Sequence, residues 1–385
     1  MLKGKHILLG VSGGIAVYKA VELASLLTKH GALVKTIMTS NAMEFVSPLT
    51  FKSITHQSVS YQLFDEKAPI EHISLADWAD IFVIAPATAN IIGKIANGIA
   101  DDLLSTSIMA GKAKKIIVPA MNVNMYENPI VQRNIQILID NHYIVMEPAT
   151  GTLACGYVGK GRFPEPTEIL TYIQVCSQTE QSLLGKKVLV TSGANREKID
   201  PMRFISNRSS GKMGISLAKA AKIMGAEVLL IHGYVVERIP YYIPSKKAES
   251  AEEMYQAVME VYDAYDLIIM CAAVADYTIK NPFSEKLKKA GDISLSLVRT
   301  KDILYELGHH KKENQIIAGF AAESENIIEN AKMKLERKKC DYIIANSLYT
   351  SGQTDTEQTL LSTDKEIFLK GSKLETACQI LKEIL

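Results

Sequence analysis

The sequence has no long apolar run and almost no net charge. No stretch of about 18 consecutive apolar residues occurs, so no segment is expected to span a membrane. Lysine and arginine number 43 and aspartate and glutamate 42, a formal net charge of +1, so no overall field would attract nucleic acid or an anionic membrane. One tryptophan and 7% aromatic residues leave little surface for stacking bases. We therefore expect neither nucleic acid nor membrane as a partner.

Cysteine is also sparse. The five cysteines are scattered and form no CxxC pair: Cys155, Cys176, Cys271, Cys340 and Cys378. Such a set argues against a disulfide framework and structural zinc, and it favours a reducing compartment. The apolar stretch Ile7–Val11 follows lysines, as in a signal peptide, but it ends at a glycine turn before a helical pattern. It is better interpreted as a first β-strand, and we expect a cytoplasmic protein.

The chain starts an α/β pattern twice. Its 385 residues suit two domains rather than one hydrophobic core. Lys5–Gly14 and Lys186–Ala194 are each a short apolar strand that runs into a turn of small residues. Each is followed by a helical pattern and a second strand: Tyr18–Ala32 with Val34–Met38, and Lys212–Ala226 with Glu227–Ile231. The polar stretch Val175–Gly185 separates the halves, which predicts domains over 1–178 and 184–385.

Further apolar runs indicate more strands in both halves. They are Ile81–Ala85, Lys115–Pro119, Leu267–Ala272, Gln315–Gly319 and Tyr342–Ala345. Near-continuous apolar runs are typical of parallel strands that are covered by helices on both faces. The predicted fold class is therefore α/β, with two doubly wound domains. In such sheets ligands bind beyond the carboxyl ends of the strands, so the residues after each strand are the candidates for function.

Small polar residues follow the strands of the first half. They are Ser12-Gly13-Gly14, Thr39-Ser40-Asn41, Pro86–Asn90 and Ala120–Asn122. A glycine turn at a helix start exposes N–H groups that bind phosphate, although it can also serve only to turn the chain. A domain that binds NAD would place Asp or Glu after the second strand, where this chain has hydroxyls and an amide. FMN therefore fits better than NAD.

Four motifs in order resemble the homo-oligomeric flavin-containing cysteine decarboxylases. They are GVSGGIAVYK, His72 within EHISL, the PATAN run, and Pro119–Met125. The resemblance covers about residues 1–175 and implies a flavodoxin-like domain. The FMN-binding residues it implies are Ser12, Gly13, Gly14, Ile15, Ser40, Pro86, Thr88, Ala89 and Asn90. Residues 154–162 resemble the flap with which the phosphopantothenoylcysteine members of the family cover their substrate.

The same resemblance assigns the chemistry of this half. An unactivated α-carboxylate needs an electron sink to leave as CO2, and oxidation of the neighbouring thiol to a thioaldehyde by the flavin provides one. The resemblance implies that His72 is the base, that Asn122 holds the substrate carboxylate and that Cys155 donates a proton. Without the motifs, His72 would be interpreted as a surface histidine and Cys155 as one cysteine among five.

The second half carries cations where the first carries neutral groups. Arg203, Arg208 and Lys212 lie within Asp200–Gly214, at a predicted helix start, which favours an anion site. The alternative without a ligand is a capped helix whose basic residues are solvated. Three lysines follow in Ser284–Lys289, and no acidic residue follows the second strand, which disfavours NAD here too.

These features resemble the ligase domain of the bifunctional phosphopantothenoylcysteine decarboxylase / phosphopantothenate–cysteine ligase family. The resemblance covers about residues 184–385 and implies a Rossmann-like domain. It implies that the carboxylate of 4'-phosphopantothenate attacks CTP, with Mg2+, and that cysteine displaces CMP from the acyl-cytidylate. Asn207 and Arg203 would serve the second step, and Lys286 would be catalytic. The remaining substrate-binding residues are Ala272, Ala273, Val274, Asp276, Lys289, Phe320, Lys334 and Lys338.

Two motifs depart from the family pattern. Ala194-Asn195 replaces Pro-Thr, and Thr300-Lys301 replaces Asn-Pro. The second departure bears on whether the 300–303 loop contacts the nucleotide, and on the preference for CTP over ATP.

Two rival functions remain open from the sequence. A non-catalytic regulator could reuse the flavin fold, but His72, Asn122 and Cys155 are all retained. A nicotinamide-dependent dehydrogenase is disfavoured by the missing strand-end carboxylates. The family resemblance also implies a homo-oligomer with flavin sites between protomers, in trimers that assemble to a dodecamer.

Overall fold

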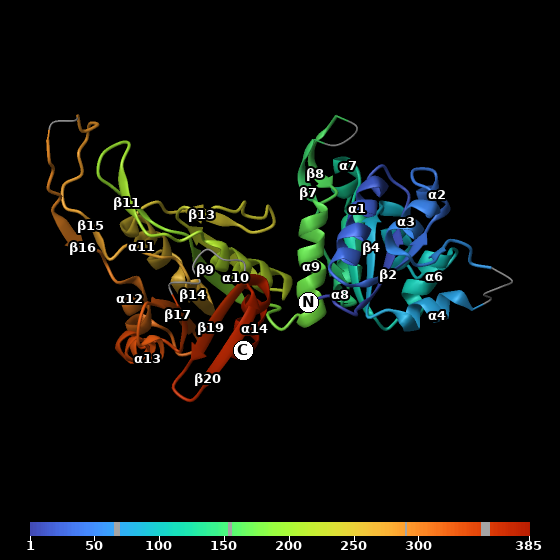
Figure 1. Cartoon of the computed structure of the whole chain (residues 1–385). Coiled ribbons are helices and arrows are strands. Elements are labelled where there is room, and N and C mark those ends of the chain that lie inside the picture. The colour runs from blue at the N-terminus through green and yellow to red at the C-terminus, as the bar shows by residue number, and fades with distance from the viewer. Residues whose placement is uncertain (65–69, 153–155, 289–290, 348–354) are drawn as a thin grey trace. The chain divides into compact units, whose positions relative to one another are not determined.

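The computed structural model describes residues 1–64, 70–152, 156–288, 291–347 and 355–385. The chain divides into two compact units, Met1–Gln178 and Thr179–Leu385 (Figure 1). Each unit is built around one largely parallel sheet. No helix in these ranges is long and apolar enough to cross a membrane.

The sheet of the first unit has six parallel strands in the order β3-β2-β1-β4-β5-β6. They are β1 (His6–Val11), β2 (Leu33–Met38), β3 (Val59–Ser60), β4 (Ile81–Ala87), β5 (Lys114–Pro119) and β6 (Ile144–Val145). Without the two-residue β3, the order is the 2-1-3-4-5 arrangement of flavodoxin-like folds. The strand order reverses between β1 and β4, and all seven residues of β4 are buried.

Helices cover both faces of this sheet. One face carries α1 (Val17–Lys29), α3 (Pro48–Thr55) and α9 (Pro166–Gln178). The other carries α4 (Glu71–Trp78), α5 (Ala89–Ala96), α6 (Leu103–Ala110) and α8 (Pro129–Asp140), which share an apolar core with the sheet. The short helices α2 (Ser40–Met43) and α7 (Val123–Tyr126) follow β2 and β5, and a hairpin joins β7 (Ala149–Thr152) to β8 (Val158–Arg162).

The sheet of the second unit has eight strands in the order β13-β12-β9-β14-β17-β18-β19-β20. They are β9 (Lys187–Ser192), β12 (Glu227–His232), β13 (Ser245–Lys247), β14 (Leu267–Met270), β17 (Ile316–Glu323), β18 (Tyr342–Ser347), β19 (Asp355–Leu361) and β20 (Glu366–Ser372). The pairings are parallel as far as β18, and β19 and β20 add an antiparallel hairpin at the edge. The doubly wound α/β prediction is confirmed, although the edge hairpin was not predicted.

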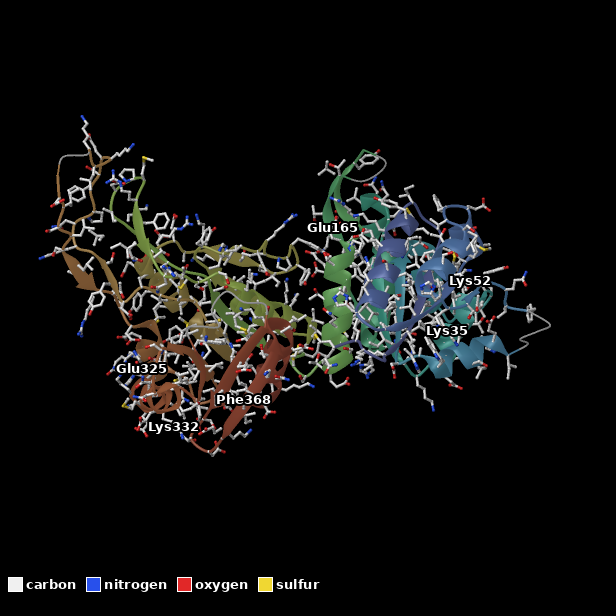
Figure 2. The ribbon with its side chains drawn as sticks, in the orientation of Figure 1. Lys35, Lys52, Glu165, Glu325, Lys332 and Phe368 are labelled. Atoms are coloured by element: carbon white, nitrogen blue, oxygen red, sulfur yellow. The ribbon has the colours of Figure 1, made fainter. Side chains whose placement is uncertain are left out.

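Helices again lie on both faces. α10 (Lys212–Ile223) packs with α14 (Lys373–Ile384) on one face. α11 (Ala251–Met259), the short 3-10 helix η1 (Tyr262–Ala264), α12 (Ile303–His310) and α13 (Ile327–Lys338) cover the other. Charged side chains such as Lys332 on α13 and Lys52 on α3 point to solvent (Figure 2).

Two hairpins project from the carboxyl edge of this second sheet. The first arm, residues 196–206, pairs β10 (Arg196–Lys198) with β11 (Phe204–Ser206). The second arm, described for residues 277–288 and 291–299, pairs β15 (Tyr277–Ile279) with β16 (Leu297–Arg299). Figure 1 shows both arms on the same side of the unit, and the Phe283 N–H donates to the Ile199 carbonyl at 2.8 Å.

A glycine at the contact between α12 and α13 yields a stability prediction. A Cβ at Gly308 would overlap the Lys338 carbonyl oxygen, so Gly308→Ala should destabilise the second unit by about 1–3 kcal/mol. The control is Gly93→Ala within α5, whose Cβ would lie 3.6 Å from Asn134 Nδ2. That change should stabilise its helix by up to about 1 kcal/mol. Hydrogen exchange of each unit, followed in denaturant, measures the change in unfolding free energy for both variants. Equal changes in the two variants would contradict the packing described.

Candidate functional site

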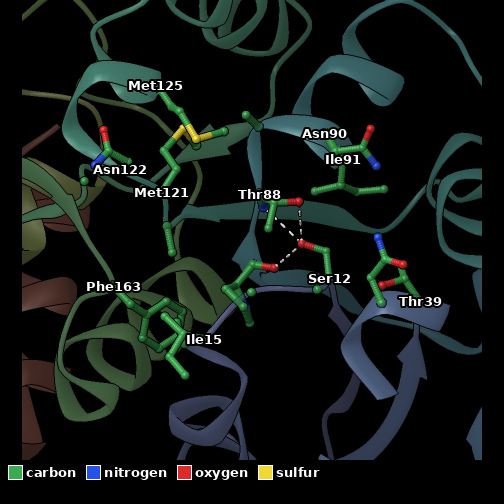
Figure 3. A pocket seen from close by; sticks show the side chains of 18 of the residues that line it. Ser12, Ile15, Thr39, Thr88, Asn90, Ile91, Met121, Asn122, Met125 and Phe163 are labelled. Carbon is green, nitrogen blue, oxygen red and sulfur yellow. Dashed lines mark hydrogen bonds between the residues drawn. The ribbon is translucent and has the colours of Figure 1, made fainter. Parts of the chain in front are cut away.

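A cavity of about 980 Å³ opens at the carboxyl edge of the first sheet (Figure 3). The residues that follow β1, β2, β4 and β5 line it, which places it where the strand order reverses. All nine residues expected to contact the cofactor lie in this lining: Ser12, Gly13, Gly14, Ile15, Ser40, Pro86, Thr88, Ala89 and Asn90. The fold thus brings together residues that are up to 78 positions apart in the sequence, from Ser12 to Asn90.

A hydroxyl network joins the segment after β1 to the segment at the end of β4. Ser12 Oγ donates to the Pro86 carbonyl oxygen at 2.8 Å, accepts the Thr88 N–H at 3.0 Å and lies 3.1 Å from Thr88 Oγ1 (Figure 3). Ser12 is 2% exposed, so these bonds hold the turn after β1 against the turn after β4. The result is a fixed cradle of small residues.

Gly13 brings a third segment into this cradle. A Cβ at Gly13 would overlap the Asn41 side chain and lie 2.6 Å from the Asn41 carbonyl carbon. The Thr39 side chain accepts the Ala42 N–H at 3.3 Å and so caps α2. The backbone after β1 therefore passes directly over the start of α2, and only glycine permits this approach.

Apolar and sulfur-containing side chains form the remaining walls. Met121 and Met125 lie on the opposite side of the pocket from Thr39 (Figure 3). Ile15 and Phe163 add apolar surface. A cavity of this size, with apolar walls and a few hydrogen-bonding groups, suits a cofactor with an aromatic ring and a phosphate. FMN therefore fits the residues that are present.

The lining also contains four charged residues that were not predicted to contact the cofactor: Lys19, Lys94, Asp102 and Arg162. Lys94 Nζ lies 2.7 Å from carboxylate oxygens of both Asp101 and Asp102. Burial disfavours the charge on Lys94, but the two carboxylates outweigh burial and raise its pKa. Burial likewise disfavours the charge on Asp102, whose pKa is nevertheless lowered by Lys94 and by the N–H of Ser105. Lys94 stands four residues after Asn90 on α5, so helical spacing could have identified it.

The three predicted catalytic residues of this half differ in how they stand relative to the pocket. Asn122 lines the pocket, and its Oδ1 accepts the Asn124 N–H at 2.8 Å at the start of α7. Cys155 lies outside the described residues. His72 lies on α4 and is not among the described residues that line the pocket. Its Nδ1 atom is buried without a hydrogen-bond partner in the described part of the chain.

In the second unit, the predicted substrate residues meet at the carboxyl edge of β14. Asn207 Nδ2 donates to the carbonyl oxygens of Ala273 and Val274 at 3.2 and 3.3 Å. The Ala272 N–H donates to Thr191 Oγ1 at the end of β9 at 3.1 Å. The segment after β11 is thereby joined to the switch point between β9 and β14.

Two lysines of α13 approach the same edge. Lys334 Nζ donates to the Phe320 carbonyl oxygen at 2.7 Å, and Lys338 forms an ion pair with Asp302. Burial lowers the pKa of Lys334, while the negative charges of Glu323 and Asp276 oppose that effect. Asp276 is therefore within electrostatic reach of Lys334. Helix spacing placed both lysines on one face, as expected.

Arg203 and Lys286 lie on the two arms. The Arg203 guanidinium donates to the Leu287 carbonyl oxygen at 2.7 Å, and so bridges the arms next to Lys286. The Lys286 side chain is exposed, and Lys289 lies outside the described residues. The structure therefore gathers the predicted residues into two neighbouring groups, one on the sheet edge and one on the arms.

Both departures from the family pattern have structural roles. Asn195 is fully buried, and its amide donates to the carbonyl oxygens of Ala248 and Glu249 at 3.4 Å each. Lys301 Nζ lies 2.8 Å from a Glu252 carboxylate oxygen on α11. Thr300 Oγ1 donates to the Ala275 carbonyl oxygen at 2.6 Å, which holds the 300–303 loop next to Asp276.

No cluster suited to a resident metal ion occurs in the described ranges, since no group of three or more His, Cys, Asp or Glu side chains comes together there. A second cavity of about 340 Å³ lies at the opposite, amino edge of the second sheet. Its lining, between Asp263 and Asp266 and between Lys312 and Gln315, contains none of the predicted site residues.

Comparison with protein families assigns each half of the chain. Residues 1–177 match the family described as "Flavoprotein". Residues 183–385 match the family described as "DNA/pantothenate metabolism flavoprotein C-terminal domain". The class is therefore an α/β flavoprotein that carries this C-terminal domain.

Individual relatives identify the family more specifically than the two domain families do. The chain is 48% identical to "Coenzyme A biosynthesis bifunctional protein CoaBC" of Bacillus subtilis, over 100% of this chain and 97% of that protein. It is 42% identical to the protein of the same name from Haemophilus influenzae, over 100% of this chain and 98% of that protein. A solved C-terminal domain of a protein of this name covers 53% of this chain and 96% of its own, at 38% identity and a TM-score of 0.46. The chain belongs to the family of bifunctional coenzyme A biosynthesis proteins.

The close approach at Gly13 generates a test of the pocket. Gly13→Ala should force the turn after β1 away from Asn41, and we expect flavin affinity to fall about tenfold or more. Gly111→Ala is the control, because its Cβ would lie 3.5 Å from Ala76 Cβ in ordinary contact. Fluorescence titration of the flavin-free proteins measures both. Equal affinity of the Gly13→Ala variant and the unmodified chain would show that the cradle does not bind the flavin.

Proposed function

We propose that this chain performs two successive steps of coenzyme A biosynthesis. Residues 184–385 join cysteine to 4'-phosphopantothenate at the expense of CTP, and residues 1–178 decarboxylate the product, with FMN, to 4'-phosphopantetheine. The observation that carries the proposal is the convergence of nine predicted cofactor contacts on one cavity at the switch point of the first sheet. Full-length similarity to relatives named as bifunctional proteins of coenzyme A biosynthesis supports it.

In the decarboxylase half, the cradle of small residues holds the cofactor. The N–H groups of Gly13 and Gly14 and the hydroxyls around Ser12 suit a phosphate. The cations of the lining are already paired, Lys94 with Asp101 and Asp102, and Lys19 and Arg162 with Glu165. Bound FMN would supply redox chemistry, a two-electron oxidation of the substrate thiol that makes loss of CO2 possible and is reversed in the product. The Asn122 amide donates to the substrate carboxylate, and Cys155 supplies the proton that completes the product.

His72 requires a second copy of the chain in this proposal. It is the proposed base, yet it lies on α4 and is not among the described residues of the pocket. Ile70 and Ile73, on either side of it, are 64% and 41% exposed. An apolar surface of this kind suits burial by another protomer. We therefore propose a homo-oligomer, based on trimers and extending to a dodecamer, in which α4 of one protomer reaches the pocket of the next.

In the ligase half, cations accommodate the triphosphate. The carboxylate of 4'-phosphopantothenate forms a bond to the α-phosphorus of CTP, and the bond to pyrophosphate breaks. The amine of cysteine then attacks the acyl carbon and CMP leaves. Lys286, Lys289 and a Mg2+ ion that arrives with the nucleotide stabilise the charge that develops in the first step. Asn207, Ala272, Ala273, Val274, Asp276, Phe320, Lys334 and Lys338 hold the nucleotide at the sheet edge, and Arg203 serves the second step.

Incubation of the purified chain with 4'-phosphopantothenate, cysteine, CTP and Mg2+ tests the whole proposal. Mass analysis should detect 4'-phosphopantetheine, pyrophosphate and CMP. Omission of CTP should abolish every product, whereas removal of the flavin should leave phosphopantothenoylcysteine. Failure of the complete mixture to form an amide product would overturn the proposal.

Paired variants should separate the two activities. Lys286→Gln should abolish pyrophosphate release, because the transition state loses a cation, while decarboxylation of supplied phosphopantothenoylcysteine continues. Cys155→Ser should do the reverse and slow CO2 release by about 10²-fold or more, because a serine hydroxyl is a much weaker acid. Rates of pyrophosphate and CO2 release measure both. Unchanged release in either variant would remove that residue from its role.

A further inference from the structure

A buried carboxylate lies where the two arms of the second unit meet. Asp200 stands in the turn of the first arm, between β10 and β11, and is 3% exposed. Both arms are otherwise largely exposed, and Figure 1 shows them projecting from the same edge. A carboxylate is rarely buried in so exposed a region unless its oxygen atoms are all engaged. The partners of the Asp200 carboxylate therefore show which parts of the two arms it holds in place.

The two oxygen atoms of Asp200 have different partners. Oδ1 accepts the backbone N–H groups of Met202 and Arg203, both at 2.7 Å, and so shapes its own turn. Oδ2 accepts the N–H of Leu287 on the second arm at 3.2 Å and lies 3.5 Å from Arg203 Nε. One oxygen thus orders the first arm, and the other joins it to the second.

Leu287 is held from both sides by this ion pair. Asp200 accepts its N–H, and Arg203 Nη2 donates to its carbonyl oxygen at 2.7 Å. Lys286 and Lys288 flank it in the chain. Because the peptide units on both sides of Leu287 are fixed, the Cα atoms of both lysines are fixed as well. Their side chains remain exposed and available to an anion.

The carboxylate is ionised at neutral pH. Burial disfavours its charge, but the N–H groups of Met202, Arg203 and Leu287 and the Arg203 guanidinium outweigh burial and lower its pKa. The first arm is also anchored at its root, since Arg196 stacks between the rings of Phe204 and Tyr234 at 4.4 and 3.9 Å. The link through Asp200 therefore connects the second arm to a fixed support.

We infer that Asp200 is a positioning residue of the ligase site, which holds Arg203 and the Lys286-bearing segment in register through Leu287. It acts through these residues and does not itself contact the substrates. The inference rests on the ligase activity proposed above. It explains how Lys286 and Lys288, on either side of Leu287, are held at the tip of the second arm beside Arg203.

Asp200→Asn isolates the link between the arms. Asparagine keeps Oδ1 for Met202 and Arg203, but an amide nitrogen replaces Oδ2 and cannot accept the Leu287 N–H. We expect pyrophosphate release to slow roughly 10- to 100-fold. KM for CTP should rise as well, whereas a smaller folded fraction would lower only the apparent kcat. Decarboxylation by the same chain should be unchanged.

A second variant removes the same hydrogen bond from the other side. Leu287→Pro lacks the N–H and leaves Asp200 intact, so a comparable loss of ligase activity is expected even where Asp200→Asn fails to fold. The matched control is Asp341→Asn, a carboxylate at the amino edge of the same sheet that accepts the Ile317 N–H at 2.8 Å and pairs with Lys311. It should keep the kcat and KM of the unmodified chain. Hydrogen exchange should accelerate in residues 283–288 of Asp200→Asn, but not in 201–203.

Three outcomes would overturn the inference. The first is a ligase activity of both Asp200→Asn and Leu287→Pro equal to that of the unmodified chain. The second is an equal loss in Asp341→Asn, which would reduce the effect to general destabilisation. The third is absence of ligase activity in the unmodified chain, which would remove the proposed function together with this inference. Activity in the unmodified chain separates the first two outcomes from the third.

Discussion

Burial of the parallel strands on both faces is the constraint on which both candidate sites depend. All seven residues of β4 and all four of β14 are buried beneath helices, so their middles cannot carry polar chemistry. Polar and charged groups accumulate where the strands end. The carboxyl edge is favoured because the chain there enters helices by their N-termini, where free N–H groups point outward. In each unit the candidate site lies next to the point at which the strand order reverses.

The two edges share this geometry but differ in their electrostatics. In the first unit the pocket presents hydroxyls, amides and glycine N–H groups, and its cations Lys19, Lys94 and Arg162 are each paired with carboxylates. In the second unit lysines and arginines stand on the two arms and on α13, with Asp200 and Asp302 as counterions. A neutral cradle suits a cofactor that stays bound, whereas a cationic edge suits a nucleotide whose charge changes during reaction.

Much of the fold followed from the sequence because its signals are local. The apolar runs, the glycine turns and the residues after each strand are continuous in sequence, and the rule for carboxyl edges converts them into a site. Contacts between segments distant in sequence could not be predicted in this way. The pair of Asp200 with Leu287 joins two hairpins that carry little hydrophobic periodicity, and the β19–β20 hairpin continues the sheet in the antiparallel sense. The position of His72 on α4, outside the lining of the described pocket, could likewise not be read from the motif, because a motif does not specify where its residue lies relative to a cavity.

A crystal structure of the chain with FMN and CTP is the measurement that tests the central claim most directly. The account predicts the flavin phosphate against the backbone of residues 12–15, and the triphosphate at the carboxyl edge of β14 beneath the Lys286 segment. Density for either ligand at the opposite edge, for example in the cavity between Asp263 and Gln315, would contradict it.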